Sequence, residues 1–593
     1  MAMSENLNDS KAMDKRQNSD TQGQQVYILQ NVGQQVDGQS AREQQTCGQP
    51  QGQQAYGQPQ GQWVYGQPSF GQQTKQTENL KKHFGILGPA CVLYSCFYAL
   101  CLYKNSGGIA YSFFLAGSLW FYCFCLKKLE ISLKKDSIFY IASILLLGLS
   151  TFCTADERIT AMNRVGVWVL TISFLLHQFY KDRNWTFGRY VGYVITAVFG
   201  SLGEIARPFL DLSAHRKSRG KKGGGIAVYI FTGLILGIPL FCVIWLLLMS
   251  ADTIFYNITY DITEKLLMGT ALEDCFGVLF MIIFMFFLTY CIMAYLCKKT
   301  FSEEYRERKR TEAVLAITIL APIMVLYLVF CGIQIVFLFL GKMTLDGYTY
   351  AEYARSGFFQ LLVVCIINLV LVLAGHAYFK ESKVLKGMLT VVSACTYIMI
   401  ASSAYRMILY IQHYYLTFLR IFVLWALVVL FILLTGVIIS IYHKTFPLFR
   451  YSMVVVTICY LVLSFSHPDY WIAKWNVANM EHFSEGDSIA ERGYYGGGYH
   501  DYRYLAGLSA DAAPALAEFL EEEGFSLEEM EEMVAQETGS KDGYFSYYEV
   551  FGGSRSGKES WGYYYLWELK EDYQNMGIRG FNLSKYIGYR LVR

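Results

Sequence analysis

The side chains best placed to do chemistry are three arginines, each at the edge of an apolar run. Arg355 lies in YAEYARSGFFQLL, residues 350–362, while Arg406 and Arg420 open and close RMILYIQHYYLTFLR. A helix of about 3.6 residues per turn brings side chains four apart onto one face. The residues that would share this face are Arg406, Tyr410, His413 and Arg420. The spacing predicts a basic, aromatic stripe for a ligand or a partner.

The candidate outer polar cluster joins both stretches. Its members are Tyr350, Glu352, Tyr353, Arg355, Arg406, Tyr410, His413 and Arg420. An arginine held in hydrocarbon costs about 3 kcal/mol on insertion scales, so these arginines belong at the interface, in a wet vestibule or in ion pairs. The alternative to a binding site is that Glu352 pairs with Arg355, while Arg406 and Arg420 extend to the headgroups as independent anchors.

Gln334 is a candidate intramembrane polar residue, because it lies within the apolar run 313–341. An amide in lipid needs a hydrogen-bond partner, so this side chain is expected to face protein. We favour a bond between helices over contact with a ligand.

The elements that must position these residues are membrane spans. Hydrophobic residues make up 54% of the 593-residue chain and charged residues only 17%, against roughly 25% in soluble proteins. A span needs about 20 apolar residues, and we identify eleven such runs. They are 85–103, 108–126, 137–154, 163–180, 226–249, 275–297, 313–341, 356–379, 388–405, 417–441 and 452–467. We expect an all-α polytopic membrane protein with about 11 transmembrane helices.

Three domains are predicted. Residues 1–79 are rich in Gln and Gly and bury too little apolar surface to fold, so they form a disordered tail. Residues 80–467 form the multi-pass transmembrane domain. Residues 468–593 form a small, mainly helical soluble domain; from residue 469 onward it carries 22 acidic and 11 basic residues, which makes it acidic.

The basic residues of the loops predict an orientation, because Lys and Arg are retained on the cytoplasmic side. With a cytoplasmic N-terminus, the connections on the inner side, together with Lys75, Lys81 and Lys82 before the first span, hold 27 basic residues, and the connections on the outer side hold eight. The C-terminal domain is then extracytoplasmic. One inner loop has a basic group that is a candidate site for anionic lipid: Arg216, Lys217, Arg219, Lys221 and Lys222.

Residues 350–362 and 406–420 resemble an uncharacterised family of bacterial polytopic membrane proteins, the domain-of-unknown-function family 4173, with its relative 4153. The resemblance extends into the tail, through WIAKWNVANMEHF, DYRYLAGLSADAAPALAEFL and FNLSKYIGYRL. The family usually has glycine in HYYLT, where this chain has Tyr414 and Tyr415. The resemblance implies a multi-pass protein of a bacterial plasma membrane and no known reaction.

Three classes of function are weighed. A membrane enzyme is disfavoured, because the chain has no HExxH motif, no serine nucleophile elbow and no carboxylate pair in a span, and no cofactor or metal is expected. The leading interpretation is an envelope protein that organises, senses or regulates through an outer polar face and a helical tail. The alternative is a permease for an anionic or neutral solute or lipid that uses the arginine cluster. No nucleic acid is expected, and a protein partner stays open.

Overall fold

The computed structural model describes residues 75–105, 107–180, 187–218, 247–259, 270–299, 311–336, 357–413, 415–443, 445–479, 499–538 and 561–593, with isolated positions between 182 and 245. The described residues are helical, and an isolated bridge pairs Thr311 with Phe379. The fold class predicted from the sequence, an all-α polytopic membrane protein, is confirmed.

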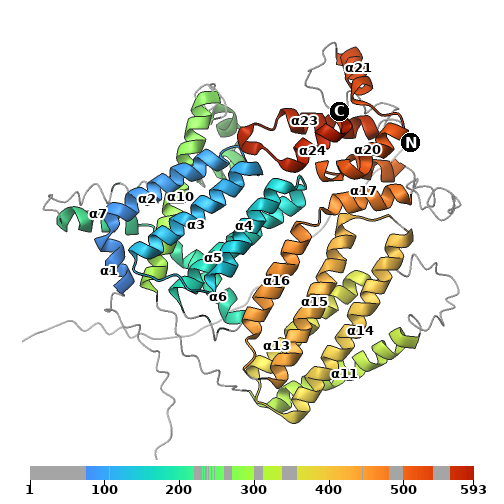
Figure 1. The fold of residues 1–593 in the computed structure, drawn as a ribbon. Helices are drawn as coiled ribbons and strands as arrows, with labels where there is room; N and C mark the ends of the chain where they lie inside the picture. Colours follow the sequence, from blue (N-terminus) through green and yellow to red (C-terminus); the bar gives the residue numbers. More distant parts are fainter. Residues whose placement is uncertain are drawn as a thin grey trace, which may run out of the picture. The chain divides into compact units, whose positions relative to one another are not determined.

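The helices fall into four sets by their contacts (Figure 1). A first helix group contains α2 (Phe84–Leu102), α3 (Gly108–Lys128), α4 (Ser137–Cys153), α5 (Glu157–Phe179), α6 (Phe187–Leu202) and α10 (Thr270–Lys298), with α1 (Lys75–Lys82) and α7 (Arg207–Ser218) beside it. A second helix group contains α11 (Ala313–Gln334), α13 (Phe358–Tyr378), α14 (Lys383–His413) and α15 (Phe418–Tyr442). Helix α16 (Leu448–Ser464) lies between the two groups. The tail contains α17 (Pro468–Ala478), α19 (Tyr499–Ala506), η2 (Ala510–Ala512), α20 (Ala513–Glu522), α21 (Leu527–Thr538), α23 (Trp561–Gln574), η3 (Ile578–Gly580) and α24 (Leu583–Val592).

Eight of the described helices are long and apolar enough to cross a membrane, and the pair α16 and α17, bent by 54°, makes a ninth if it counts as one span. Helix α4 is also apolar but has only 17 residues, near the lower limit of about 17–25 for a span. The expected span 226–249 falls mostly outside the described residues. The other ten expected spans each coincide with a described helix.

Two buried asparagines, one in each group, tie neighbouring helices together. Asn163 of α5 donates to Ser150 and Thr151 of α4, and accepts from Tyr460 and Ser464 of α16. In the second group, Asn368 of α13 accepts from Tyr327 of α11 at 2.7 Å and donates to Thr396 of α14 at 3.0 Å. An amide in lipid must be satisfied by protein, so each asparagine fixes the positions of three helices.

Helix α16 joins the two groups. Its Phe449 is part of the hydrophobic core of the first group. On its other side, Trp425 of α15 donates to the carbonyl of Cys459, and Tyr451 donates to the carbonyl of Ile432 of α15. Because α16 packs against both α4 and α15, it connects the two groups.

Two boundaries predicted from the sequence need correction. The disordered tail was expected to reach residue 79, but α1 begins at Lys75 because Thr77 donates to the carbonyl of Cys297 and Asn79 donates to that of Leu129. The span expected at 388–405 is a helix that continues to His413. Its last part continues because Met407 and Ile411 are buried in the core of the second group. Residues 1–74 lie outside the described residues.

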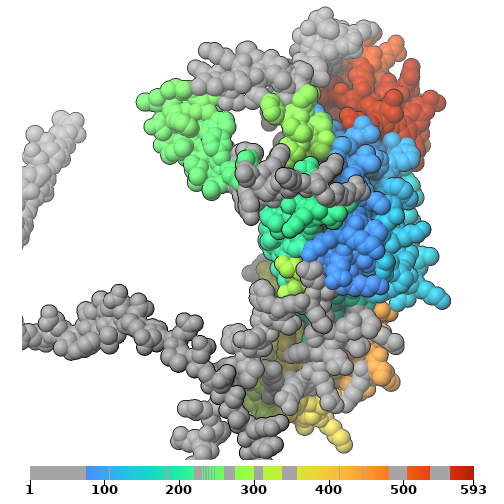
Figure 2. All heavy atoms as spheres, turned by 90° about the vertical axis from the view of Figure 1, so that its left-hand side faces the viewer, coloured from blue at the N-terminus to red at the C-terminus, as the bar shows by residue number. Residues whose placement is uncertain are grey.

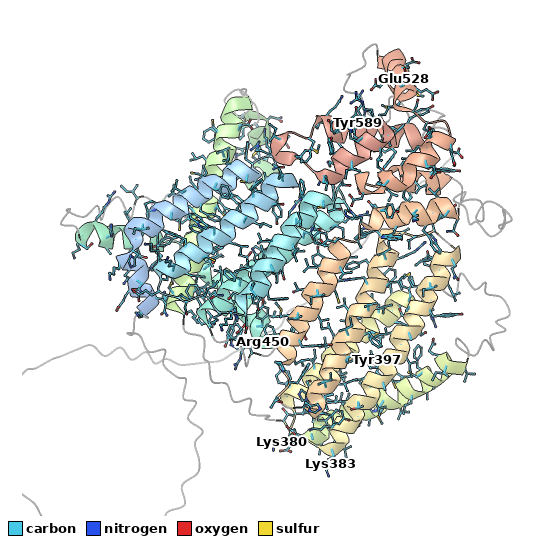
Figure 3. All side chains as sticks on the ribbon, viewed as in Figure 1. Lys380, Lys383, Tyr397, Arg450, Glu528 and Tyr589 are labelled. Atoms are coloured by element: carbon cyan, nitrogen blue, oxygen red, sulfur yellow. The ribbon has the colours of Figure 1, made fainter. Side chains whose placement is uncertain are left out.

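The helix ends nearest the tail contact one another and the tail. Tyr103, after α2, donates to Asp274 of α10 at 2.8 Å, and Arg579 of the tail donates to the carbonyl of Leu100. In Figure 2 the atoms of the tail lie directly against those of the first helices. At the opposite helix ends, Arg450 pairs with Asp136 at 2.9 Å, and Figure 3 shows Lys380 and Lys383 on that side as well.

Candidate functional site

Arg406 is buried inside the second helix group and is only 7% exposed. Its Nη2 donates to Oε1 of Gln334 at 3.2 Å, and the hydroxyl of Ser402 donates to the same oxygen at 2.6 Å. Ser402 and Arg406 are four residues apart on α14, so they share a face, while Gln334 is the last residue of α11. The structure thus joins two residues that the sequence placed in separate groups.

The N-terminus of α13 lies against the same guanidinium. Gly357, the residue before the helix, has a φ of +96°, and a Cβ atom there would lie 3.2 Å from Nη1 of Arg406. Position 357 therefore favours glycine twice, for its backbone conformation and for the close approach of the arginine. The hydroxyl of Ser403 also donates to the carbonyl of Phe358 at 3.4 Å.

Arg420 reaches the cluster from a different helix. The chain leaves α14 at His413 and enters α15 at Phe418, so the four residues expected on one helical face are divided between two helices. The correct relation is a cation–π contact, in which the guanidinium carbon of Arg420 lies 4.1 Å from the ring centroid of Tyr410. Tyr410 in turn contacts the ring of Phe358.

The structure therefore brings Gln334, Arg406, Tyr410 and Arg420 to one end of the second helix group. We name these four residues the Arg406 cluster. His413 is the last residue of α14. The other predicted members, Tyr350, Glu352, Tyr353 and Arg355, lie outside the described residues. Among the residues that the structure covers, no group of three or more His, Cys, Asp or Glu side chains is arranged to hold a metal ion.

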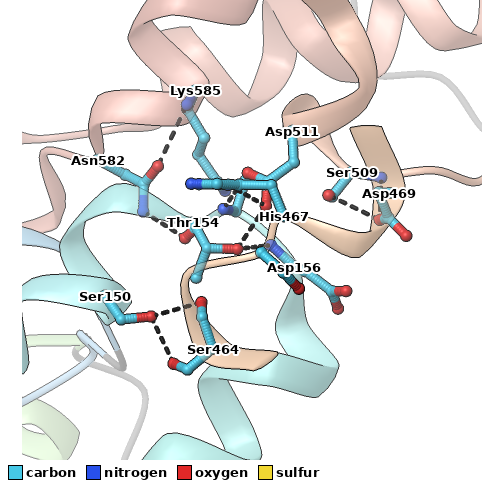
Figure 4. A network of polar contacts seen from close by, with 12 residues as sticks. Ser150, Thr154, Asp156, Ser464, His467, Asp469, Ser509, Asp511, Asn582 and Lys585 are labelled. Atoms are coloured by element: carbon cyan, nitrogen blue, oxygen red, sulfur yellow. Dashed lines mark hydrogen bonds and ion pairs between the residues drawn. The ribbon is translucent and has the colours of Figure 1, made fainter. Parts of the chain in front are cut away.

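A second polar site, which sequence reasoning missed, joins the tail to the first helix group. We name it the docking junction; Figure 4 shows most of it, and it comprises Thr151, Thr154, Ala155, Asp156, Arg158, His467, Asp469, Ser509, Asp511 and Asn582. Asp156, Asp469 and Asp511 are each at most 4% exposed. Three buried carboxylates at one interface require compensation by hydrogen bonds or by a cation.

Arg158 compensates two of these carboxylates. It lies in the first turn of α5, where Asp156 caps the helix by accepting from the Arg158 amide at 2.8 Å. Its Nε donates to Asp156 at 2.9 Å, and its Nη2 pairs with Asp469 of the tail. The guanidinium also lies 4.2 Å from the ring centroid of Phe418, the first residue of α15. One arginine thus touches the first group, the second group and the tail.

Asp511 is the third buried carboxylate of the docking junction. It accepts from the amide of Ala155 at 2.7 Å and from the hydroxyl of Thr154, and His467 lies 3.1 Å away. Burial disfavours the carboxylate, but these hydrogen bonds outweigh burial and hold the pKa of Asp511 below its usual range. The same contact raises the pKa of His467 above its usual value. Both groups are therefore stabilised in their charged forms.

Two further tail contacts complete the interface. Asn582 caps α24 and donates to the carbonyls of Thr154 at 2.8 Å and Thr151 at 3.3 Å. On the side of the second group, Asn476 of α17 exchanges two hydrogen bonds with the backbone of Leu416, and the Tyr504 hydroxyl accepts from the amide of Phe418. The tail therefore contacts both helix groups.

Sequence reasoning missed the junction because its partners are far apart in the chain. Arg158 and Asp469 are separated by 311 positions, and Thr154 and Asp511 by 357. One local signal was present. Asp156 and Arg158 lie shortly before the apolar run 163–180, and an aspartate at the start of a helix is a good cap. Their partners in the tail had no comparable pattern.

A comparison with family models matches residues 141–519 to the family described as a domain of unknown function (DUF4153). The match contains the whole Arg406 cluster and all three carboxylates of the docking junction, whereas Asn582 lies beyond it. No curated protein and no solved structure matches the chain. The resemblance to family 4153 is confirmed, and the one to family 4173 stays a prediction. Because the match covers more than half of its length, this chain belongs to the DUF4153 family.

Proposed function

We propose that this chain is a non-catalytic envelope protein in which the tail organises, senses or regulates by fixing the two helix groups relative to each other. The observation that carries the proposal is the docking junction. A buried ion pair adds little net stability, but losing one partner is costly, so such pairs favour one arrangement over others. Arg158 has contacts in the first group, the second group and the tail, which suits it to register a displacement of any of them.

Charge supports an orientation for this arrangement. The helix ends opposite the tail carry Lys380, Lys383 and Arg450, as Figure 3 shows, in line with the excess of basic residues in loops assigned to the cytoplasm. We therefore place the N-terminus in the cytoplasm of a bacterium and the tail outside its plasma membrane. A cysteine-labelling scan tests this: the loop 298–310 should react only from the cytoplasm, and the tail only from outside.

Hydrogen–deuterium exchange of the whole protein in nanodiscs tests the coupling. The variant Asp511→Asn removes the charge that His467, Thr154 and Ala155 stabilise, and these three partners all lie outside α15. Exchange should rise in the tail and also in the first turns of α15. The matched control is Asp572→Asn, a tail carboxylate paired with Lys585 outside the junction. A rise confined to the tail and the Thr154 region would contradict the proposal.

A permease for an anionic or neutral solute or lipid is the second candidate, and the Arg406 cluster is the observation that favours it. A buried guanidinium lies beside the N-terminus of α13, and both carry positive charge that favours an anion. Flux measurements in proteoliposomes with a panel of solutes separate the candidates. Saturable flux that is lost in Arg406→Gln would favour the permease over the regulatory proposal.

Anionic lipid is proposed as a further partner at α7. Asp211 anchors this helix to α10, because it accepts from Tyr290 at 2.9 Å, and within α7 it also pairs with Arg207 at 3.2 Å. Arg216 and Lys217 lie exposed in its last turn, while Arg219, Lys221 and Lys222 lie outside the described residues. Each basic residue near an anionic surface contributes about 1 kcal/mol of attraction.

A further inference from the structure

Helix α17 carries two unlike faces. One face is buried: Asp469 is 1% exposed, and Ile472 and Ala473 are fully buried in the hydrophobic core of the tail. The other face holds Trp471 and Trp475, 53% and 41% exposed, with the exposed Lys474 between them. Exposed indoles on a helix whose opposite face is well packed indicate that the exposed face contacts something other than the core of the tail.

The contacts of α17 fix its depth. Its beginning meets the start of α5, where Asp469 pairs with Arg158, and its end meets the start of α15, where Asn476 bonds to the backbone of Leu416. Asp469 and Asn476 are seven residues apart, which is about 10 Å along a helix. Because α5 and α15 are both membrane spans, α17 crosses the bundle at the level where these spans begin.

An apolar, exposed segment of the chain leads directly to this helix. Helix α16 exposes Ile458 and Val462, the latter 66% exposed, and ends at Ser464. A 54° bend then separates it from α17. The chain therefore turns away from the direction of a span at the end of an apolar, exposed segment, as expected where a helix reaches the surface of a bilayer.

The chemistry of the exposed face fits that surface. Tyr470 and Trp471 pack edge to face with ring centroids 5.3 Å apart, and Nζ of Lys474 lies 5.7 Å from both centroids. Tryptophan and tyrosine concentrate at the membrane–water interface, where the ring is in apolar surroundings and the polar atom meets headgroups. A lysine among them extends its charge to lipid phosphates.

We propose that Trp471, Lys474 and Trp475 of α17 contact the phospholipid headgroup region of the leaflet on the side of the tail. The opposite face of the same helix carries Asp469 of the docking junction. Because α17 connects the leaflet to this junction, the leaflet is the partner to which the docked tail responds. The lipid contact does not depend on the proposed function. Only the response of the tail to the leaflet rests on the proposed function.

Tryptophan fluorescence of the whole protein in vesicles of phosphatidylcholine and phosphatidylglycerol tests the contact. The signal of interest is the difference between the protein and the double variant Trp471→Phe, Trp475→Phe, which keeps aromatic bulk. Lipids brominated near the headgroup should remove most of this difference signal, and lipids brominated near the chain ends should remove less. The matched control is Trp561→Phe, because Trp561 is 4% exposed in the tail core and its signal should resist both lipids.

Other results would overturn the proposal. Quenching by water-soluble acrylamide without quenching by brominated lipid would place the face in water. Resistance to both quenchers would mean that a protein surface, such as a second copy of the chain, covers it. A separate measurement addresses the response of the tail: Lys474→Glu should raise protease cleavage of the tail in vesicles and not in detergent. Lipid quenching with unchanged cleavage would leave the contact standing and contradict the response.

Discussion

The docking junction and the Arg406 cluster both hold arginine at the same end of the helices, but the contacts of these arginines reach different parts of the molecule. Arg158 pairs with two carboxylates, one from its own helix start and one from the tail. Among its contacts, Arg406 donates to the neutral amide of Gln334, and Arg420 packs against the ring of Tyr410. The ion pair of Arg158 with Asp469 therefore crosses from the first helix group to the tail, whereas these contacts of Arg406 and Arg420 stay within the second helix group.

Arg158→Gln should have the largest effect, because it leaves Asp156 and Asp469 buried without their cation. Breaking a buried pair costs about 3–5 kcal/mol, and the partial exposure of Arg158 lowers this figure. We expect rapid protease cleavage of the tail together with a lower unfolding temperature in detergent. A tail that stays as resistant as in the unchanged protein would remove the distinction between the two arginine sites.

Arg406→Gln should have a smaller effect that stays within the second helix group. It removes a hydrogen bond from a buried guanidinium, typically worth about 1.5–3 kcal/mol, but glutamine retains a donor. The unfolding temperature should fall, while the protease resistance of the tail stays the same. Loss of tail protection in this variant would contradict the expectation that the tail docks independently of Arg406.

The pH dependence of tail docking sharpens the comparison, because His467 and Asp511 titrate and the amide of Gln334 does not. The raised pKa of His467 contributes stability that is complete below its unfolded value of about 6.5 and is lost as the pH rises through the folded pKa. The lowered pKa of Asp511 contributes stability above about 3.9 that is lost as the pH falls through its folded pKa. Protease resistance of the tail should therefore be highest between these limits.

The control for this profile is His467→Gln. It should flatten the decline on the alkaline side and move the acid limb to higher pH, because Asp511 loses the hydrogen bond of His467 that lowers its pKa and keeps those of Thr154 and Ala155. An alkaline decline that persists in this variant would assign the titration to another group.

Deleting residues 2–74 should have the smallest effect. The deletion leaves α1 intact, including the bonds from Thr77 and Asn79 to the first helix group. A Gln/Gly-rich terminus contributes little buried area, so the unfolding temperature in detergent should be nearly unchanged. A marked loss of folded protein would instead mean that the leader packs against the membrane domain.

The spans could be predicted from the sequence because each apolar run carries its own signal. The exact ends could not, since α14 continues past Arg406 for reasons of packing: Met407 is fully buried in the second helix group. Gln334 was predicted to bond between helices, but its partners, Ser402 and Arg406, follow 68 and 72 positions later on α14. Periodicity describes one helix at a time, so contacts between helices are beyond its reach.

The same limit explains the error at Arg420. Its spacing from Arg406 fits a continuous helix, and only the turn between α14 and α15 shows that the two arginines belong to different helices. Arg158 and Asp469 were both visible as charges next to spans. Nothing local showed that they meet, because their pairing depends on how α17 crosses the start of α5.

The central claim is that the tail docks through Arg158 and independently of Arg406, and a pair of double-mutant cycles tests it most directly. One cycle combines Arg158→Gln with Asp469→Asn, and the other combines Arg406→Gln with Asp469→Asn, with protease resistance of the tail as the readout. Residues in one ion-pair network show coupling of about 0.5–3 kcal/mol, whereas distant residues add within about 0.5 kcal/mol. We predict clear coupling in the first cycle and additivity in the second. Coupling between Arg406 and Asp469, with additivity at Arg158, would contradict the account.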